Sequence, residues 1–403
     1  MNKQFVQELI KNYKPGFSLE QAFYTSNDVF EAEWTSIFKK QWLFAGKTAQ
    51  IKKPGDYFLY QLQKDSIIII RGNHGKVHAH YNTCRHRGSV ICLEDAGHAA
   101  KLICPYHQWV YDKDGSLLNA RLMPDDFCKE EYNLHSVHVK TVEGLIFISL
   151  SKDPPDFSPI ENSLHSYLKP YKIDKATVAC IKNYRLNANW KLVGENFREC
   201  YHCGGAHPEY CGAVIGANLR EDITELTSEK HKAWKEKGLE TRLIEVTEGT
   251  TTYAVRYALR PGVESYSVTG KKVSIPKGDH VDHDAGVVGL VNYPNFWMDA
   301  VSDYVWTMRV TPVDAATTDL QFCWLVDEKA IEGHHYDLKN LTEFWEITGD
   351  QDAKLCENNF KGIQSNAYQP GPYAPVEDQV MNFVDWCVGQ VRKSLAETEN
   401  VET

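Results

Sequence analysis

The sequence predicts an α+β protein in which a β-rich domain precedes a domain with helices packed on an antiparallel sheet, a helix-grip-like arrangement. Three observations predict this fold. Short β-rich runs fill the stretch from Trp42 to about Leu150, a proline-rich stretch (KDPPDFSP) begins at Lys152, and helices and strands alternate irregularly after it. With 403 residues, the chain has enough length for two hydrophobic cores.

The local patterns assign the elements in order. Residues 1–41 are expected to be helical and to pack on the second domain, because FEAEWTSIFKKQW spaces apolar residues three and four apart. Residues 42–155 form the β-rich domain, with strands DYFLYQL, DSIIIIRG, KVHAHYNT and GLIFISL. Residues 156–403 form the second domain. Its expected elements are helices SLHSYLKPY and NWKLVGENFRECYH, strands GVVGLVNY, DYVWTMRVTPV and TDLQFCWLVD, and a long closing helix from about Asp337 to about Ser365.

Composition excludes several classes of protein. Hydrophobic residues make up 42% and charged residues 24%, as in ordinary soluble proteins. No apolar run reaches the length of a membrane span, and the N-terminus lacks the apolar core of a signal peptide. A net charge of −10 gives no indication of nucleic-acid binding. Eleven scattered cysteines are best explained as reduced thiols, so we expect a cytoplasmic protein.

Two short segments in the β-rich domain have metal-ligand spacing. Cys84-Arg-His86 and Cys104-Pro-Tyr-His107 give the pattern Cys-x-His-x17-Cys-x2-His. A Rieske [2Fe–2S] centre binds one iron through two thiolates and the other through two imidazoles, so each loop must offer one sulfur and one nitrogen. The alternative is a Cys2His2 zinc site, but such sites more often pair Cys-x2–4-Cys with His-x3–5-His. The pattern therefore predicts an electron-carrying Rieske cluster held by these four residues.

A second candidate metal site lies in the other domain, in NWKLVGENFRECYHCGGAHPEY. His202 and His207 are candidate ligands, and Glu199 precedes His202 by about one helical turn. Two histidines and one carboxylate on one side of a metal are typical of non-heme Fe(II) oxygenases. We expect Asp352 to be the third ligand, because it falls on a mostly apolar helical stripe where an unpaired carboxylate is costly. Asp350 is the competing choice.

Other interpretations of these residues stay open. His202 and His207 could be hydrogen-bonded core histidines, and Cys200, Cys203 and His207 could instead hold zinc. Two further groups resemble metal sites in composition only. HVDHD, which begins at His280, is expected to be a solvated turn, and His334-His335 an exposed turn before the last helix.

Four stretches carry a resemblance to a known family. They are KQWLFAGKT from Lys40, the loops NTCRHRGS and CPYHQWVYDKDG, the segment ENFRECYHCGGAHP, and SNAYQPGPYAPVED near the C-terminus. Throughout its length the chain resembles the α-subunits of Rieske non-heme iron oxygenases. Within that family it is most similar to the quaternary-amine branch of glycine betaine, choline and carnitine monooxygenases and stachydrine demethylase. The C-terminal stretch and SDYVWTMRVTP look most like the demethylating glycine betaine enzymes.

The resemblance implies an activity and its partners. It implies a mononuclear Fe2+ that uses O2, a homotrimer, and electrons from NAD(P)H through a separate flavin/ferredoxin-type reductase, since this chain has no Gly-rich nucleotide fingerprint. The expected reaction turns glycine betaine into dimethylglycine and formaldehyde. Alternatives are oxidation of choline to betaine aldehyde, or of carnitine or proline betaine, and a Rieske electron carrier without its own chemistry.

The resemblance also implies roles for single residues. Glu199, where most of the family has aspartate, would bridge His107 of a neighbouring subunit to His202. A quaternary ammonium cannot donate a hydrogen bond, so we expect aromatic faces around the substrate. The candidates are Trp297, Tyr201, Tyr304, Trp306, Phe360 and Tyr368.

Overall fold

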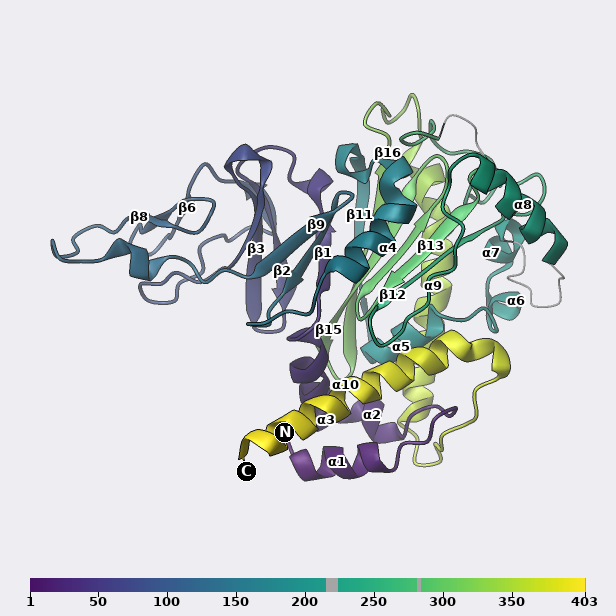
Figure 1. Ribbon diagram of the computed structural model, residues 1–403, viewed down its shortest axis with the longest axis horizontal. Helices are drawn as coiled ribbons and strands as arrows, with labels where there is room; N and C mark the ends of the chain where they lie inside the picture. Colours follow the sequence, from purple (N-terminus) through teal and green to yellow (C-terminus); the bar gives the residue numbers. More distant parts are fainter. Residues whose placement is uncertain (215–223, 281–283, 403) are drawn as a thin grey trace. The chain divides into compact units, whose positions relative to one another are not determined.

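The computed structural model describes residues 1–214, 224–280 and 284–402, and the chain divides into two compact units. The smaller unit comprises Gln41–Phe157 with Ile173–Lys175, and the larger unit comprises the rest of the described chain. The helices of residues 1–40 belong to the larger unit. Helices and antiparallel sheets occur in the combination expected, so the predicted α+β class is confirmed (Figure 1).

The smaller unit is built from three antiparallel sheets. One sheet has the order β1 (Leu43–Lys47), β10 (Leu145–Ser149), β9 (His138–Val142). The second has the order β4 (Val77–Tyr81), β3 (Asp65–Arg71), β2 (Asp56–Leu62), β5 (Ala96–His98). The third has the order β6 (Leu102–Ile103), β7 (Val110–Tyr111), β8 (Leu117–Asn119). Strand β3 is buried on both faces at Ile67–Ile70, which explains its unbroken run of isoleucine.

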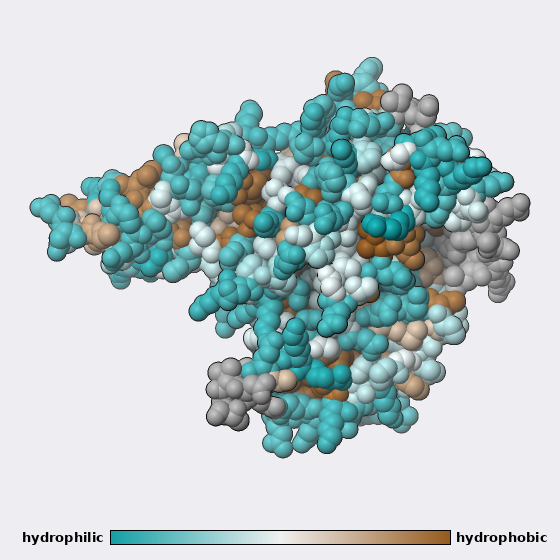
Figure 2. Space-filling view, viewed as in Figure 1, coloured by the Kyte–Doolittle hydropathy of each residue, from teal (hydrophilic) through white to brown (hydrophobic). Residues whose placement is uncertain are grey.

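The candidate cluster loops lie at the β6–β8 end of this unit. Cys84 and Cys104 belong to a buried cluster that also contains Trp109 and Tyr111. Large apolar side chains remain exposed at the same end, among them Leu93 (70% exposed) and Leu122 (97% exposed). Figure 2 shows apolar surface at this end of the unit. Exposed apolar surface near a candidate redox centre is suited to an interaction site.

A six-stranded antiparallel sheet forms the centre of the larger unit. Its order is β11 (Thr177–Leu186), β16 (Thr317–Val326), β15 (Val305–Asp314), β14 (Phe296–Ala300), β13 (Val287–Asn292), β12 (Thr252–Tyr257). Helix α9 (Leu338–Ile363) packs on β11, and α4 (Ser158–Leu168) packs on β12 (Figure 1). Trp345 of α9 stacks on Trp306 of β15 with ring centroids 3.9 Å apart. This contact holds α9 against the sheet.

The remaining helices of the larger unit complete its layers. They are α1 (Lys3–Lys11), α2 (Gln21–Thr25), α3 (Asn27–Glu33), α5 (Trp190–Asn196), α6 (Cys203–Ala206), α7 (Pro208–Ala213), α8 (Thr224–Glu236) and α10 (Asp378–Glu402). Helix α10 packs on α1, α3 and α5, and α3 is also joined to α5 directly by Glu33, which accepts from Trp190 Nε1 and Lys191 Nζ.

Two expectations about helices were wrong. The segment NWKLVGENFRECYH is not one helix, because α5 ends at Asn196 and Glu199 lies in the irregular segment that follows it. The long helix ending near Ser365 does not close the chain, since α10 follows it. No helix in the described part of the chain is both long and apolar enough to cross a membrane.

Candidate metal centres and the adjoining cavity

In the two predicted cluster loops the cysteine side chains are buried and the histidine side chains lie nearer the surface. Cys84 and Cys104 are 3% and 1% exposed, whereas His86 is exposed and His107 is half-buried. The two imidazole rings lie with centroids 4.6 Å apart at 75°. A cluster with its thiolate iron buried and its imidazole iron near solvent would fit this arrangement.

Backbone hydrogen bonds fix the shape of each loop. Cys84 N donates to Ser89 O at 2.8 Å, and Cys104 N donates to Trp109 O at 2.9 Å. The Tyr111 hydroxyl lies 3.3 Å from Cys84 Sγ, where it can donate to a thiolate. Burial raises the pKa of the Cys84 thiol. A buried thiolate therefore needs a compensating positive charge, which iron would supply.

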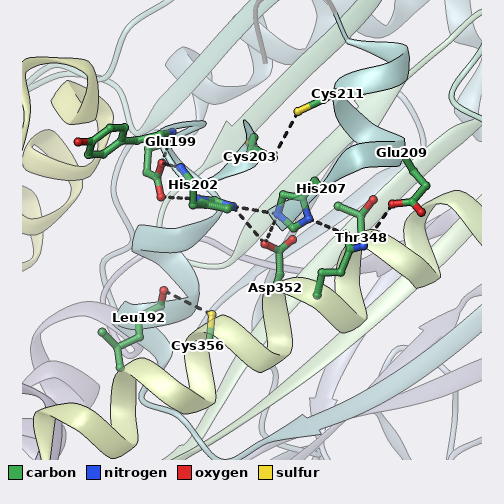
Figure 3. A network of polar contacts seen from close by, with 12 residues as sticks. Leu192, Glu199, His202, Cys203, His207, Glu209, Cys211, Thr348, Asp352 and Cys356 are labelled. Carbon is green, nitrogen blue, oxygen red and sulfur yellow. Dashed lines mark hydrogen bonds and ion pairs between the residues drawn. The ribbon is translucent and has the colours of Figure 1, made fainter. Parts of the chain in front are cut away.

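His202, His207 and Asp352 come together in the larger unit (Figure 3). His202 directly precedes α6, His207 lies between α6 and α7, and Asp352 lies in the middle of α9. Asp352 Oδ1 lies 3.4 Å from His202 Nε2 and 3.0 Å from His207 Nε2. The two Nε2 atoms are 3.0 Å apart. Their ligand atoms all lie within 4.8 Å of one another.

The arrangement passes a structural test for a bound cation. Asp352 is 4% exposed, and its Oδ1 atom has no hydrogen bond among the described residues. Asp350, the competing carboxylate, is exposed. The alternative set of Cys200, Cys203 and His207 does not converge, because His202, His207 and Asp352 form the only described group with three metal-ligand atoms close together. An oxygen and two imidazole nitrogens on one side of a metal suit Fe(II).

Hydrogen bonds to the far side of each ring orient the two histidines. His202 Nδ1 lies 2.5 Å from Glu199 Oε1, and His207 Nδ1 lies 2.7 Å from Gln351 Oε1. Both oxygens only accept, so each Nδ1 carries a proton and each Nε2 is the nitrogen turned toward Asp352, where it can bind a metal. Gln351 is in turn held by Glu209, whose Oε2 accepts from its Nε2 at 3.2 Å.

Negative charge dominates around the two imidazoles. Burial lowers the pKa of His202, but Asp352 and Glu199 outweigh it and raise that pKa to about 10. Asp352 similarly outweighs burial and raises the pKa of His207. The carboxylates that stabilise the protonated imidazoles in this way would also stabilise a divalent cation bound between them.

A cavity of about 360 Å³ opens beside the three ligand residues. Aromatic rings form much of its wall, contributed by Phe197, Tyr210, Tyr257, Trp297 and Trp345. Its charged lining residues other than histidine are Arg198, Glu199, Asp299 and Asp352. Arg198 is the only lysine or arginine among the described lining residues. The cavity therefore combines aromatic faces with charges of both signs.

The aromatic residues predicted to surround the substrate do not all line this cavity. Trp297 lines the cavity, but Tyr201 is 63% exposed and Tyr304 donates to Tyr266 O inside the core. Phe360 is buried on α9, and Tyr368 lines a second cavity of about 320 Å³ that also borders Glu199 and His202. None of these last four is among the described residues that line the cavity of about 360 Å³.

The two groups that resemble metal sites in composition only, HVDHD from His280 and His334-His335, differ in burial. His280 is 5% exposed and packs against Tyr171, so the expectation of a solvated turn was wrong at this residue. Asp284 is exposed, and residues 281–283 of that segment lie outside the described chain. His334 is exposed, as expected.

Comparisons with known proteins match both halves of the chain. The family model for the catalytic domain of ring-hydroxylating α-subunits matches residues 173–393, and the Rieske [2Fe-2S] domain model matches residues 41–139. The chain is 38% identical to the glycine betaine monooxygenase oxygenase subunit of Pseudomonas aeruginosa, over 97% of this chain and 92% of that protein. It is 33% identical to the carnitine monooxygenase oxygenase subunit of Acinetobacter pittii, over 90% of each chain.

The fold matches solved structures as well. A quaternary ammonium Rieske monooxygenase in complex with L-carnitine superposes with a TM-score of 0.71 at 22% identity, over 97% of this chain and 99% of that chain. Naphthalene 1,2-dioxygenase from Rhodococcus sp. superposes with a TM-score of 0.67 at 18% identity, over 96% and 98%.

Asp352→Ala should remove the mononuclear metal while leaving the visible spectrum of the cluster unchanged. The substitution deletes the carboxylate between His202 and His207 in the larger unit, whereas the cluster loops belong to the smaller unit. Metal analysis beside the absorption spectrum measures both centres. Asp350→Ala is the matched control, because this exposed carboxylate lies two residues away. Equal metal loss in both variants would contradict the assignment of Asp352.

Gln351→Leu should weaken metal binding by roughly tenfold, because it removes the oxygen that accepts from His207 Nδ1. Titration of the metal-free protein with Fe(II) under nitrogen gives the affinity. Glu209→Gln serves as the control, since it changes the partner of Gln351 and keeps the amide oxygen on His207. Unchanged affinity in Gln351→Leu would show that the ring is oriented by packing alone.

Proposed function

Because the chain belongs to the family of Rieske non-heme iron oxygenase α-subunits, we propose that it removes a methyl group from glycine betaine. The observation that carries this proposal is the aromatic cavity of about 360 Å³ beside His202, His207 and Asp352. The 38% identity to a glycine betaine monooxygenase oxygenase subunit over nearly the whole chain selects the substrate within that class. An electron carrier without chemistry would have no use for the second centre.

The family's cofactors fit the residues that would hold them. The enzyme uses a Rieske [2Fe–2S] cluster, a mononuclear iron and O2, with electrons from NAD(P)H through a separate reductase. We assign the cluster to Cys84, His86, Cys104 and His107, and the mononuclear iron to His202, His207 and Asp352. The iron supplies oxygen activation, and the overall change is betaine + O2 + 2e⁻ + 2H⁺ → dimethylglycine + formaldehyde + H2O.

The chain's own residues bind and orient the substrate. The aromatic rings of Phe197, Tyr257 and Trp297 exclude water and offer π faces to a trimethylammonium group, an attraction of roughly 2 kcal/mol when desolvated. Arg198 is suited to the opposite end of the substrate. Its guanidinium lies over the Tyr293 and Phe383 rings and donates to Gly194 O, but its buried Nε atom has no hydrogen-bond partner among the described residues. A substrate carboxylate that reached Nε would satisfy it.

We further propose that Glu199 connects the two kinds of centre between subunits of a homotrimer. Its carboxylate holds His202 Nδ1, and Tyr201, two residues further along the chain, is 63% exposed, so this segment is accessible to another chain. His107 is half-buried and borders exposed Tyr106 (57%) and Ile103 (52%), which suit a docking surface. A cytoplasmic location agrees with the eleven free cysteines.

Glu199→Gln should keep both metal centres and slow turnover by roughly a hundredfold, since it replaces the charged acceptor that orients His202. Steady-state formaldehyde release, with oxygen uptake measured in parallel, reports rate and coupling together. Glu199→Asp is the companion variant because it keeps the charge and shortens the reach by one methylene. Normal, fully coupled turnover in Glu199→Gln would remove the bridging role.

Glycine betaine should give the highest kcat/KM in a panel that also contains choline, carnitine and proline betaine. Choline lacks the carboxylate that would pair with Arg198, and we expect it to be a poor substrate. Formaldehyde release with O2, NADH and a purified reductase measures N-demethylation directly. Dominance of choline or carnitine would refute the choice of substrate and leave the oxygenase class intact.

A further inference from the structure

A buried carboxylate faces the same cavity without a role in binding the metal. Asp299 lies in β14, is 3% exposed and lines the cavity together with His202, His207 and Asp352. Residues two apart on a strand point to the same face, and Trp297 lines the cavity beside it. Asp299 is therefore an acid that the sheet contributes to the cavity wall, whereas Asp352 comes from α9.

The protein holds Asp299 by hydrogen bonds and not by a positive charge. Trp297 Nε1 donates to its Oδ2 at 2.8 Å, and the Tyr257 hydroxyl donates to its Oδ1 at 2.9 Å. Tyr257 also lies 2.7 Å from the Tyr266 hydroxyl. None of the described lysine, arginine or histidine side chains forms an ion pair with Asp299. A buried anion without a counter-charge is costly, so its retention needs a reason.

The surroundings keep this carboxylate available as an anion. Burial raises the pKa of Asp299, and the hydrogen bonds from Trp297 and Tyr257 limit the rise to about 6. Gly289 on β13 leaves space beside the pair, since a Cβ there would lie 3.1 Å from the Tyr257 ring and 3.6 Å from Asp299 Oδ1. The two donors thus orient an ionised group that faces an aromatic-walled cavity.

We propose that Asp299 is the counter-charge for the quaternary ammonium of the substrate and the residue that makes the cavity select a cation. This inference rests on the proposed function and extends it from the aromatic faces to one ion pair. A trimethylammonium group has no N–H to donate, so the attraction is between charges. The hydrogen bonds from Trp297 and Tyr257 therefore need not be broken when it binds.

The proposal predicts how the cavity binds a ligand in which an uncharged group replaces trimethylammonium. A ligand of the same shape with carbon in place of nitrogen would leave Asp299 buried and unpaired, and its binding would carry that desolvation cost. 3,3-Dimethylbutanoate is such a ligand for glycine betaine, because it keeps the carboxylate and replaces trimethylammonium by tert-butyl. Cation–π attraction to the aromatic walls also favours betaine, but Asp299→Asn leaves those walls in place, so the loss of preference on substitution isolates the charge of Asp299.

The experiment measures binding of glycine betaine and of 3,3-dimethylbutanoate to the iron-loaded enzyme without O2, by calorimetry. We expect the wild type to prefer betaine, and Asp299→Asn to reduce that preference by at least about tenfold, because the substitution keeps the shape and removes the charge. The amide oxygen of the introduced side chain can still accept from Trp297, and the Tyr257 hydroxyl can turn to donate to Tyr266. Equal affinity of the wild type for both ligands would overturn the proposal whether or not the variant folds.

Asp303→Asn is the matched control. Asp303 is likewise buried, but Ser265 and the backbone of Val273 and Ser274 hold it, and it does not line the cavity. Asp303→Asn should keep the preference for betaine. If Asp299→Asn weakens both ligands by the same factor, Asp299 only supports Trp297 and Tyr257, and the proposal fails. Formaldehyde release from betaine by the wild type tests the proposed function separately.

Discussion

The candidate active site depends on one buried carboxylate that lies between two imidazoles. Asp352 is placed there by α9, whose position is set by the stacking of Trp345 on Trp306. Its Oδ1 atom lies within 3.4 Å of both histidine Nε2 atoms and has no hydrogen bond among the described residues. Burying such an anion costs several kcal/mol unless a cation compensates it. The same helix also supplies Gln351, so one packed element determines both a ligand and the orientation of His207.

The charges around the cavity define what it can bind. Asp352 and Glu199 act on the metal side, whereas Asp299 lies on the sheet wall and Arg198 provides the only described lysine or arginine in the lining. Aromatic rings form much of the wall between them. A small zwitterion with a trimethylammonium group at one end would use every one of these features. In this account, substrate choice comes from fixed charges in a dry cavity, and the oxygen chemistry comes from the iron.

Local sequence patterns predicted the fold class and the residues that meet at each candidate centre, because those residues lie in short motifs or on one helical stripe. Asp352 could be chosen over Asp350 since helical periodicity places it with Cys356 and Phe360, which are buried. Asp299 could not be found this way. Its partner Tyr257 lies two strands away across Gly289, and the register of distant strands is not visible in a single sequence. The same limit explains why the sequence does not distinguish Tyr304 and Phe360, which pack in the core, from the aromatic residues that line the cavity.

The central claim is that one chain holds an electron-carrying cluster and a separate catalytic iron. Analysis of purified protein for iron, zinc and acid-labile sulfide, with its visible spectrum, tests this most directly. The account predicts a red-brown protein with about three irons and about two labile sulfides per chain. Stoichiometric zinc without labile sulfide would contradict it, because the Cys84, His86, Cys104 and His107 loops would then hold a structural metal and no electrons could reach the cavity.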